Sequence, residues 1–135
     1  RNDPVFAELS EAERNMVCER ILEEVRGRMM EEIVLLETTK AIDKNHRVFK
    51  MTFAGAEFDM VIFCDKTNSC ECYEIKHSDQ IVENQTRYLT DAEYLKATER
   101  RFGPITGKYV IYRGESCDVN GIHYLNVEAY LKGLA

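Results

Sequence analysis

GAEFDMVIF at Gly55–Phe63 and CYEIKHS at Cys72–Ser78 are two neighbouring segments rich in aromatic and β-branched residues, the composition of β-strands. Between them, Asp65–Ser69 is a short polar segment suited to the loop of a hairpin. The two segments therefore predict a β-hairpin, and the rest of the chain is expected to fold around it.

The charged residues of this hairpin are predicted to meet on one face. Residues two apart on a strand share a face, so Glu74 and Lys76 project together. Folding the hairpin about Thr67 places Asp59 opposite that pair. The same alternation gives this face Glu57, Val61, Phe63 and Cys72.

Two carboxylates and a lysine on an otherwise apolar face suggest metal chemistry, because buried charge is costly unless it is paired or holds a metal. Hard cations such as Mg²⁺ take carboxylate oxygens, water and substrate phosphate as ligands, and a nearby lysine can orient a water or stabilise charge on phosphorus. Asp59, Glu74 and Lys76 thus have the parts for metal-assisted phosphodiester hydrolysis. The alternative is a cross-strand ion pair on a solvated sheet edge, which stabilises little.

The composition is that of an ordinary globular domain, with 135 residues, 44% hydrophobic and 31% charged. A net charge of −6 argues against a general nucleic-acid coat protein but not against a nuclease, whose acidic metal site adds to the negative count. No apolar run is long enough for a membrane span, so no membrane partner is expected. Because the chain starts at Arg1, we expect a fragment of a longer protein, with residues 1–9 a tether and residues 10–135 one domain.

The five cysteines are odd in number and several occupy core-like positions, which favours reduced thiols and a cytoplasmic setting. They are Cys18, Cys64, Cys70, Cys72 and Cys117. The pair Cys70 and Cys72 lacks a second Cys/His pair at zinc spacing, so a zinc site is not expected.

The N-terminal part predicts helices. Ser10–Glu13 is a capping box, and apolar residues follow at three- and four-residue spacing. Gly27 is expected to bend or divide the helical region, which continues from Arg28 to Ile42 and is apolar enough to pack against the sheet.

After the helices, Arg47–Phe53 is predicted as a strand that precedes the hairpin. Ala54–Gly55 is the turn between them. A helical region is expected after Ser78–Asp79, running to about Phe102 and broken near a second capping box at Thr90–Glu93.

Lys108–Tyr112 is expected to be an interior, possibly parallel strand, because it has little polar content. Asn120–Gly121 is a hairpin turn signal, and Asn126 is expected to cap a helix ending at Leu134. The fold class is therefore α/β, with a central mixed sheet of four to five strands flanked by helices.

Asp59 followed by a turn and then Glu74–Lys76 resembles the PD-(D/E)XK nuclease superfamily, which has the restriction-endonuclease-like fold. Gly27–Val34, Glu57–Val61 and Tyr73–Ser78 together resemble one branch more closely, the nuclease-like domain at the C-terminus of bacterial and archaeal AAA+ ATPases. The resemblance covers roughly residues 20–113. Its motifs are short, and their order and spacing carry it.

The resemblance implies roles for four residues. Asp59 and Glu74 would bind Mg²⁺ or Mn²⁺, and Lys76 would position the attacking water and stabilise the pentavalent phosphorus. Glu31 would match an additional metal-binding glutamate on the preceding helix, with Glu32 as the alternative. Phe58 stands at the superfamily's nominal proline position, a substitution that the group tolerates.

The implied partners are DNA, an ATPase portion N-terminal in the same chain, and a second copy, since cutting both strands usually needs a dimer. A non-catalytic module of the ATPase that senses nucleic acid, regulates or docks protein is the alternative function. A third hypothesis is an oligomerisation domain that uses the apolar residues around Met29–Leu36.

Several other polar residues fit ordinary structural interpretations. Glu57 is a candidate for a second metal but fits a solvated charge better, and His77 fits packing better than general-base catalysis. Gln85 and Tyr88 faintly match a downstream nuclease motif, which we interpret as chance. Basic residues that could contact phosphate but are expected on a solvated face are Arg87, Lys96, Arg100, Arg101, Lys108 and Arg113. No P-loop for ATP is present.

Overall fold

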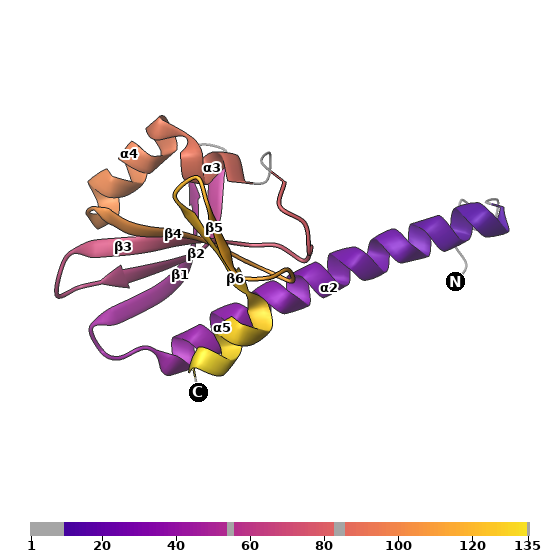
Figure 1. Ribbon diagram of the computed structural model, residues 1–135, viewed down its shortest axis with the longest axis horizontal. Coiled ribbons are helices and arrows are strands. Elements are labelled where there is room, and N and C mark those ends of the chain that lie inside the picture. The colour runs from indigo at the N-terminus through magenta and orange to yellow at the C-terminus, as the bar shows by residue number, and fades with distance from the viewer. Residues whose placement is uncertain (1–9, 54–55, 83–85, 135) are drawn as a thin grey trace.

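A computed structural model describes residues 10–53, 56–82 and 86–134 and shows an α/β fold with one mixed sheet (Figure 1). The strand order is β1-β2-β3-β4-β6-β5. The strands are β1 (His46–Phe53), β2 (Ala56–Cys64), β3 (Ser69–Ile75), β4 (Ile105–Tyr112), β5 (Cys117–Val119) and β6 (Ile122–Asn126). The helices are α2 (Glu11–Ala41), α3 (Arg87–Thr90), α4 (Ala92–Phe102) and α5 (Val127–Leu134).

The sheet has six strands in the described part of the chain, so the prediction of four to five was too low. Both strands of the short C-terminal hairpin join the sheet, because β6 pairs with β4 in parallel and β5 pairs with β6 in antiparallel. Asn120 and Gly121 have φ values of 51° and 80°, as the predicted tight hairpin turn requires. The amide of Ala129 donates to Asn126 Oδ1 at 3.1 Å, which confirms the predicted cap of α5.

The central hairpin has the predicted register. β2 and β3 pair antiparallel from Met60 opposite Tyr73 to Cys64 opposite Ser69. Asn68 in the intervening loop has a φ of 53°. Continuing the register by one position places Asp59 opposite Glu74.

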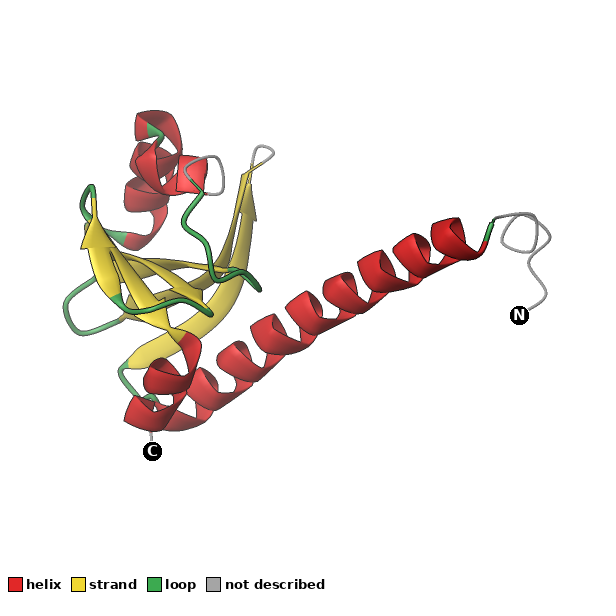
Figure 2. Ribbon diagram, turned by 45° about the vertical axis from the view of Figure 1, so that its right-hand side comes forward, coloured by secondary structure: helices red, strands yellow, loops and turns green. Residues whose placement is uncertain are grey.

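The core lies in two layers, one on each face of the sheet (Figure 2). Helices α2 and α5 cover one face, where Val34 of α2 packs with Met60 and Ile75. Helices α3 and α4 cover the other, where the buried residues include Val61, Cys72 and Val110. Strand β4 lies inside the sheet, parallel to both β3 and β6, as predicted for Lys108–Tyr112.

Strand β2 departs from strict alternation at a β-bulge in its pairing with β1. Phe49 pairs with Val61 and Met51 pairs with Phe58, so Lys50 alone opposes Asp59 and Met60. Phe58 and Val61 therefore share the core on the α3–α4 side. The expectation that alternation runs unbroken from residue 57 to residue 63 is wrong for this reason.

Helix α2 is continuous for 31 residues, so Gly27 does not divide it. A glycine costs a helix only about 1 kcal/mol relative to alanine, less than the surrounding helix-forming residues can supply. The predicted capping box is present, with the Glu13 amide donating to Ser10 Oγ at 3.1 Å. The N-terminal half projects beyond the sheet (Figure 1). No helix in the described part of the chain is long and apolar enough to cross a membrane.

The predicted helical region after residue 78 begins later than expected. Residues 76–82 are not helical. Ser78 Oγ instead accepts from the Gln80 amide at 3.1 Å, a local bond that competes with helix formation. The break near Thr90 is confirmed, but the cap of α4 is Asp91, whose Oδ1 accepts from the amides of Glu93 and Tyr94.

Candidate functional site

Asp59 and Glu74 are buried carboxylates on adjacent strands. Their residues are 7% and 3% exposed, respectively. The register continued by one position places them opposite each other, at the edge of the sheet where β3 ends and β2 begins. The structure therefore brings together the two carboxylates that the sequence singled out.

The bulge in β2 explains how Asp59 reaches this edge. Asp59 Oδ2 accepts a hydrogen bond from the Ile75 amide at 2.8 Å. The backbone pairing of β2 with β3 stops at Met60 and Tyr73. Beyond that point, the Asp59 carboxylate accepts the hydrogen bond from β3 in place of a backbone carbonyl. This bond ties the Asp59 side chain to the backbone of β3, at the residue that follows Glu74.

Lys76 follows directly after β3 and extends the site toward solvent. Its Nζ lies 4.0 Å from Glu74 Oε1, and its side chain is 30% exposed against 4% for Glu74. The Lys76 amide donates to Ile111 O at 2.9 Å, which anchors the backbone beyond the last strand residue. The sheet thus holds the backbone of Lys76, and the lysine side chain extends from the buried Glu74 carboxylate toward solvent.

Glu31 lies on the opposite side of the sheet from Glu74. Its Oε1 accepts from Lys50 Nζ at 2.8 Å, and the two side chains are 22% and 46% exposed. Lys50 alternates with Val48 and so lies on the α2 side of the sheet. Glu74 alternates with Cys72, which belongs to the core on the α3–α4 side.

Within the described ranges, no group of three or more His, Cys, Asp or Glu side chains is placed to hold a metal ion. The structure therefore brings together Asp59, Glu74 and Lys76 without Glu31, and Glu32 is exposed on the same helix. Lys50, the partner of Glu31, was missed. The alternation within Arg47–Phe53 was the signal that could have placed Lys50 on the face of the sheet that α2 covers.

Two buried groups beside the site, the Cys72 thiol and the Tyr73 hydroxyl, have raised pKa values. The hydrogen bond with Cys70 and burial both raise the pKa of the Cys72 thiol. Burial likewise raises the pKa of Tyr73 far above its usual range, and its hydroxyl donates to Glu71 Oε1 at 3.1 Å. All five cysteines are free. At neutral pH, Cys72 and Tyr73 therefore add no negative charge to the site.

The arrangement suits a hard divalent cation. Mg²⁺ is commonly held by one or two carboxylates, with waters and substrate phosphate completing six oxygen ligands. Asp59 and Glu74 supply carboxylate oxygens from a preformed, buried position, so the donor set fits this group.

The remaining candidates lie away from this group or outside the described part. His77 is half-buried on the α2 side, where it lines a groove with Met30 and Arg113. The Tyr88 ring packs against Tyr94 with centroids 5.0 Å apart. The side chains of Glu57, Gln85 and Arg87, the Ala54–Gly55 turn and the tether at residues 1–9 lie outside the described residues.

The other basic candidates are at least partly exposed. Lys96, Arg100 and Arg101 lie on α4, where Arg101 stacks over the Phe102 ring at 5.7 Å. Lys108 is half-buried on β4, and Arg113 is exposed just beyond it.

Comparison with known proteins gives no match: no family model, no curated protein and no solved structure corresponds to this chain. The resemblance to PD-(D/E)XK nucleases therefore stays a prediction that rests on the sequence motifs.

Proposed function

We propose that this domain hydrolyses phosphodiester bonds in DNA with Mg²⁺ or Mn²⁺, on a sheet of the restriction-endonuclease-like type. The observation that carries the proposal is the burial of Asp59 and Glu74 on adjacent strands, with Asp59 bonded to the Ile75 amide and the Lys76 ammonium 4.0 Å from Glu74. Carboxylates are rarely buried unless they are paired or bind a metal. Attachment to an AAA+ ATPase portion rests on the sequence resemblance alone.

Each residue has a distinct role in this proposal. Asp59 and Glu74 hold the cation, which when bound lowers the pKa of a coordinated water and offsets charge on the phosphate. The Ile75 amide orients Asp59. Lys76 is near enough to orient the attacking water and to stabilise the charge that develops on the phosphoryl oxygens.

A non-catalytic regulatory or docking domain is the second candidate. The pairing of Glu31 with Lys50 favours it, because it leaves the predicted third carboxylate outside the group. The net charge of −6 also favours a module that does not bind long stretches of nucleic acid.

Cleavage of supercoiled, single-stranded and branched DNA with Mg²⁺ or Mn²⁺ separates the two candidates. We expect metal-dependent cleavage by the wild type and a loss of about 100-fold or more in Lys76→Ala, as for other removed transition-state stabilisers. Lys132→Ala, an exposed lysine on α5, is the matched control and should cleave normally. If the wild type cleaves no substrate and gains no stability from either metal, the non-catalytic function replaces this proposal.

A further inference from the structure

The outer side of α2 exposes a line of apolar residues that the fold leaves uncovered. We name Cys18, Leu22, Val25 and Met29 the outer stripe. They are separated by four, three and four residues, the spacing of a helix-packing seam. Leu22, Val25 and Met29 are 50%, 45% and 53% exposed, and Cys18 is exposed as well.

The outer stripe faces away from the sheet. Val34 and Thr38, the buried residues of α2, lie on the opposite side of the helix at 100° per residue. A soluble helix ordinarily carries one apolar side that faces the core. A second apolar side indicates a second packing partner.

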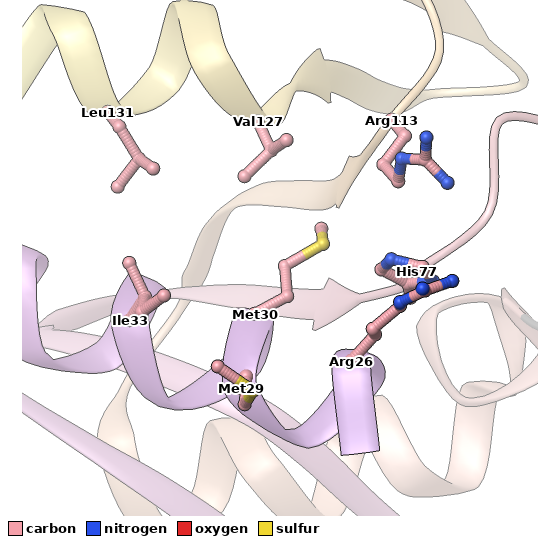
Figure 3. A pocket seen from close by; sticks show the side chains of 8 residues that line it. All are labelled: Arg26, Met29, Met30, Ile33, His77, Arg113, Val127 and Leu131. Carbon is pink, nitrogen blue, oxygen red and sulfur yellow. The ribbon is translucent and has the colours of Figure 1, made fainter. Parts of the chain in front are cut away.

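A groove continues the outer stripe on the globular end of the molecule. It has a volume of about 310 Å³ and lies between α2 and α5 (Figure 3). Its apolar part is formed by Met29, Met30, Ile33, Val127 and Leu131. Arg26, His77 and Arg113 gather at one end in Figure 3, so the groove is apolar with a basic rim.

The projecting half of the same helix has the complementary chemistry. Residues 11–25 contain five glutamates and two arginines, a net charge of −3, and none of the fifteen is buried. The glutamates are Glu11, Glu13, Glu19, Glu23 and Glu24. A helical segment of this length is marginal without tertiary contacts, so a surface that packs against it would stabilise it.

We propose that two copies of this chain pair through α2 in antiparallel orientation, each projecting half lying along the groove of the other copy. In this register Leu22 packs against Val25 of the second copy, and Cys18 packs against its Met29. Glu19 then lies beside Arg26 of the second copy, and the two-fold symmetry makes this ion pair twice.

The charges select the antiparallel orientation. A parallel pair would bring the two acidic halves against each other, whereas the antiparallel pair brings each acidic half to the basic rim of the groove. The globular parts lie at opposite ends of the helix pair. This pairing does not depend on nuclease activity.

Sedimentation equilibrium of the 135-residue chain tests the pairing. The wild type should be a dimer at sub-millimolar concentration. Leu22→Gln should raise the dissociation constant about 100-fold, because each dimer loses two buried leucines. Met16→Gln is the matched control: Met16 is 61% exposed on α2 but lies off the outer stripe, so this variant should dimerise like the wild type. A monomeric wild type, or equal effects of the two variants, would overturn the proposal.

Charge reversal and cross-linking test the orientation. Glu19→Arg and Arg26→Glu should each weaken the dimer, and the two together should restore it. Met29→Cys should form an intermolecular disulfide with the native Cys18 under mild oxidation, and adding Cys18→Ser should abolish it. Cross-linking of wild-type Cys18 to Cys18 of a second copy would indicate the parallel orientation and overturn the antiparallel one. Circular dichroism confirms that each variant keeps its helix.

Discussion

The sheet edge at Asp59 and Glu74 and the outer stripe of α2 depart in opposite ways from the usual distribution of residues. The sheet edge buries two carboxylates, 7% and 3% exposed. The outer stripe leaves Leu22 and Met29 half-exposed on a helix that projects from the molecule. Scattered apolar residues on a surface are ordinary, but buried carboxylates and an aligned row of exposed apolar residues are informative.

The two departures indicate different partners. A buried pair of carboxylates would be stabilised by a small divalent cation at the end of the strands, as we propose. An aligned apolar row on a helix is stabilised by a surface of matching shape, such as another helix. The sheet therefore carries the proposed chemical site, and α2 carries the proposed interaction surface. The same long helix covers the core with one side and presents the outer stripe with the other.

The inner side of α2 provides the largest expected effect on stability. Val34 is 0% exposed between the helix and the sheet, so Val34→Ala should lower the free energy of unfolding by about 1.5–3 kcal/mol. Val17→Ala is the same change in the projecting half, off the outer stripe, and should alter stability by less than about 0.5 kcal/mol. Urea denaturation monitored by circular dichroism measures both.

Similar losses in the two valine variants would contradict this division of α2. They would mean that the projecting half packs as tightly as the half beneath the sheet.

The end of α2 provides a smaller effect, from charges that are exposed rather than buried. Asp43 Oδ1 lies 2.7 Å from His46 Nδ1, and this hydrogen bond raises the pKa of His46 and lowers that of Asp43. Because the folded pKa of His46 is the higher one, its contribution to stability is present below pH 6.5 and is lost as the pH rises through the raised pKa. The Asp43 contribution is present above pH 3.8 and is lost as the pH falls through the lowered pKa.

NMR titration of the imidazole measures this effect. Asp43→Asn should return the pKa of His46 toward its ordinary value. An unchanged titration in that variant would show that the pair does not form in solution.

The hairpin shows how much of the fold could be predicted from the sequence. Polar loop residues and the composition of the strands were enough to predict the register that pairs Met60 with Tyr73 and Cys64 with Ser69. Asn120–Gly121, the Ser10 cap and the Asn126 cap were predicted correctly because each depends on a local bond or a local backbone angle.

The rest depends on tertiary contacts that leave no local signal. The bulge at Asp59 and Met60 breaks the alternation without any glycine or proline to mark it. Gly27 indicated a break in the helix, but flanking residues carry the helix through it. Glu31 was matched to a motif by its place in the sequence, whereas its partner Lys50 comes from a strand 19 residues later. Motif order predicted the residues of the candidate site, but not which face of the sheet each would occupy.

A titration with Mn²⁺ followed by thermal unfolding tests the central claim, that Asp59 and Glu74 form a metal site. We expect Mn²⁺ to raise the melting temperature of the wild type, corresponding to about 2.7 kcal/mol at 100 times the dissociation constant. Asp59→Asn keeps an oxygen that can accept from the Ile75 amide but removes the charge, so its melting temperature should not respond to the metal. Glu31→Gln should respond like the wild type, because Glu31 pairs with Lys50. No response in the wild type, or the same response in Asp59→Asn, would contradict the account.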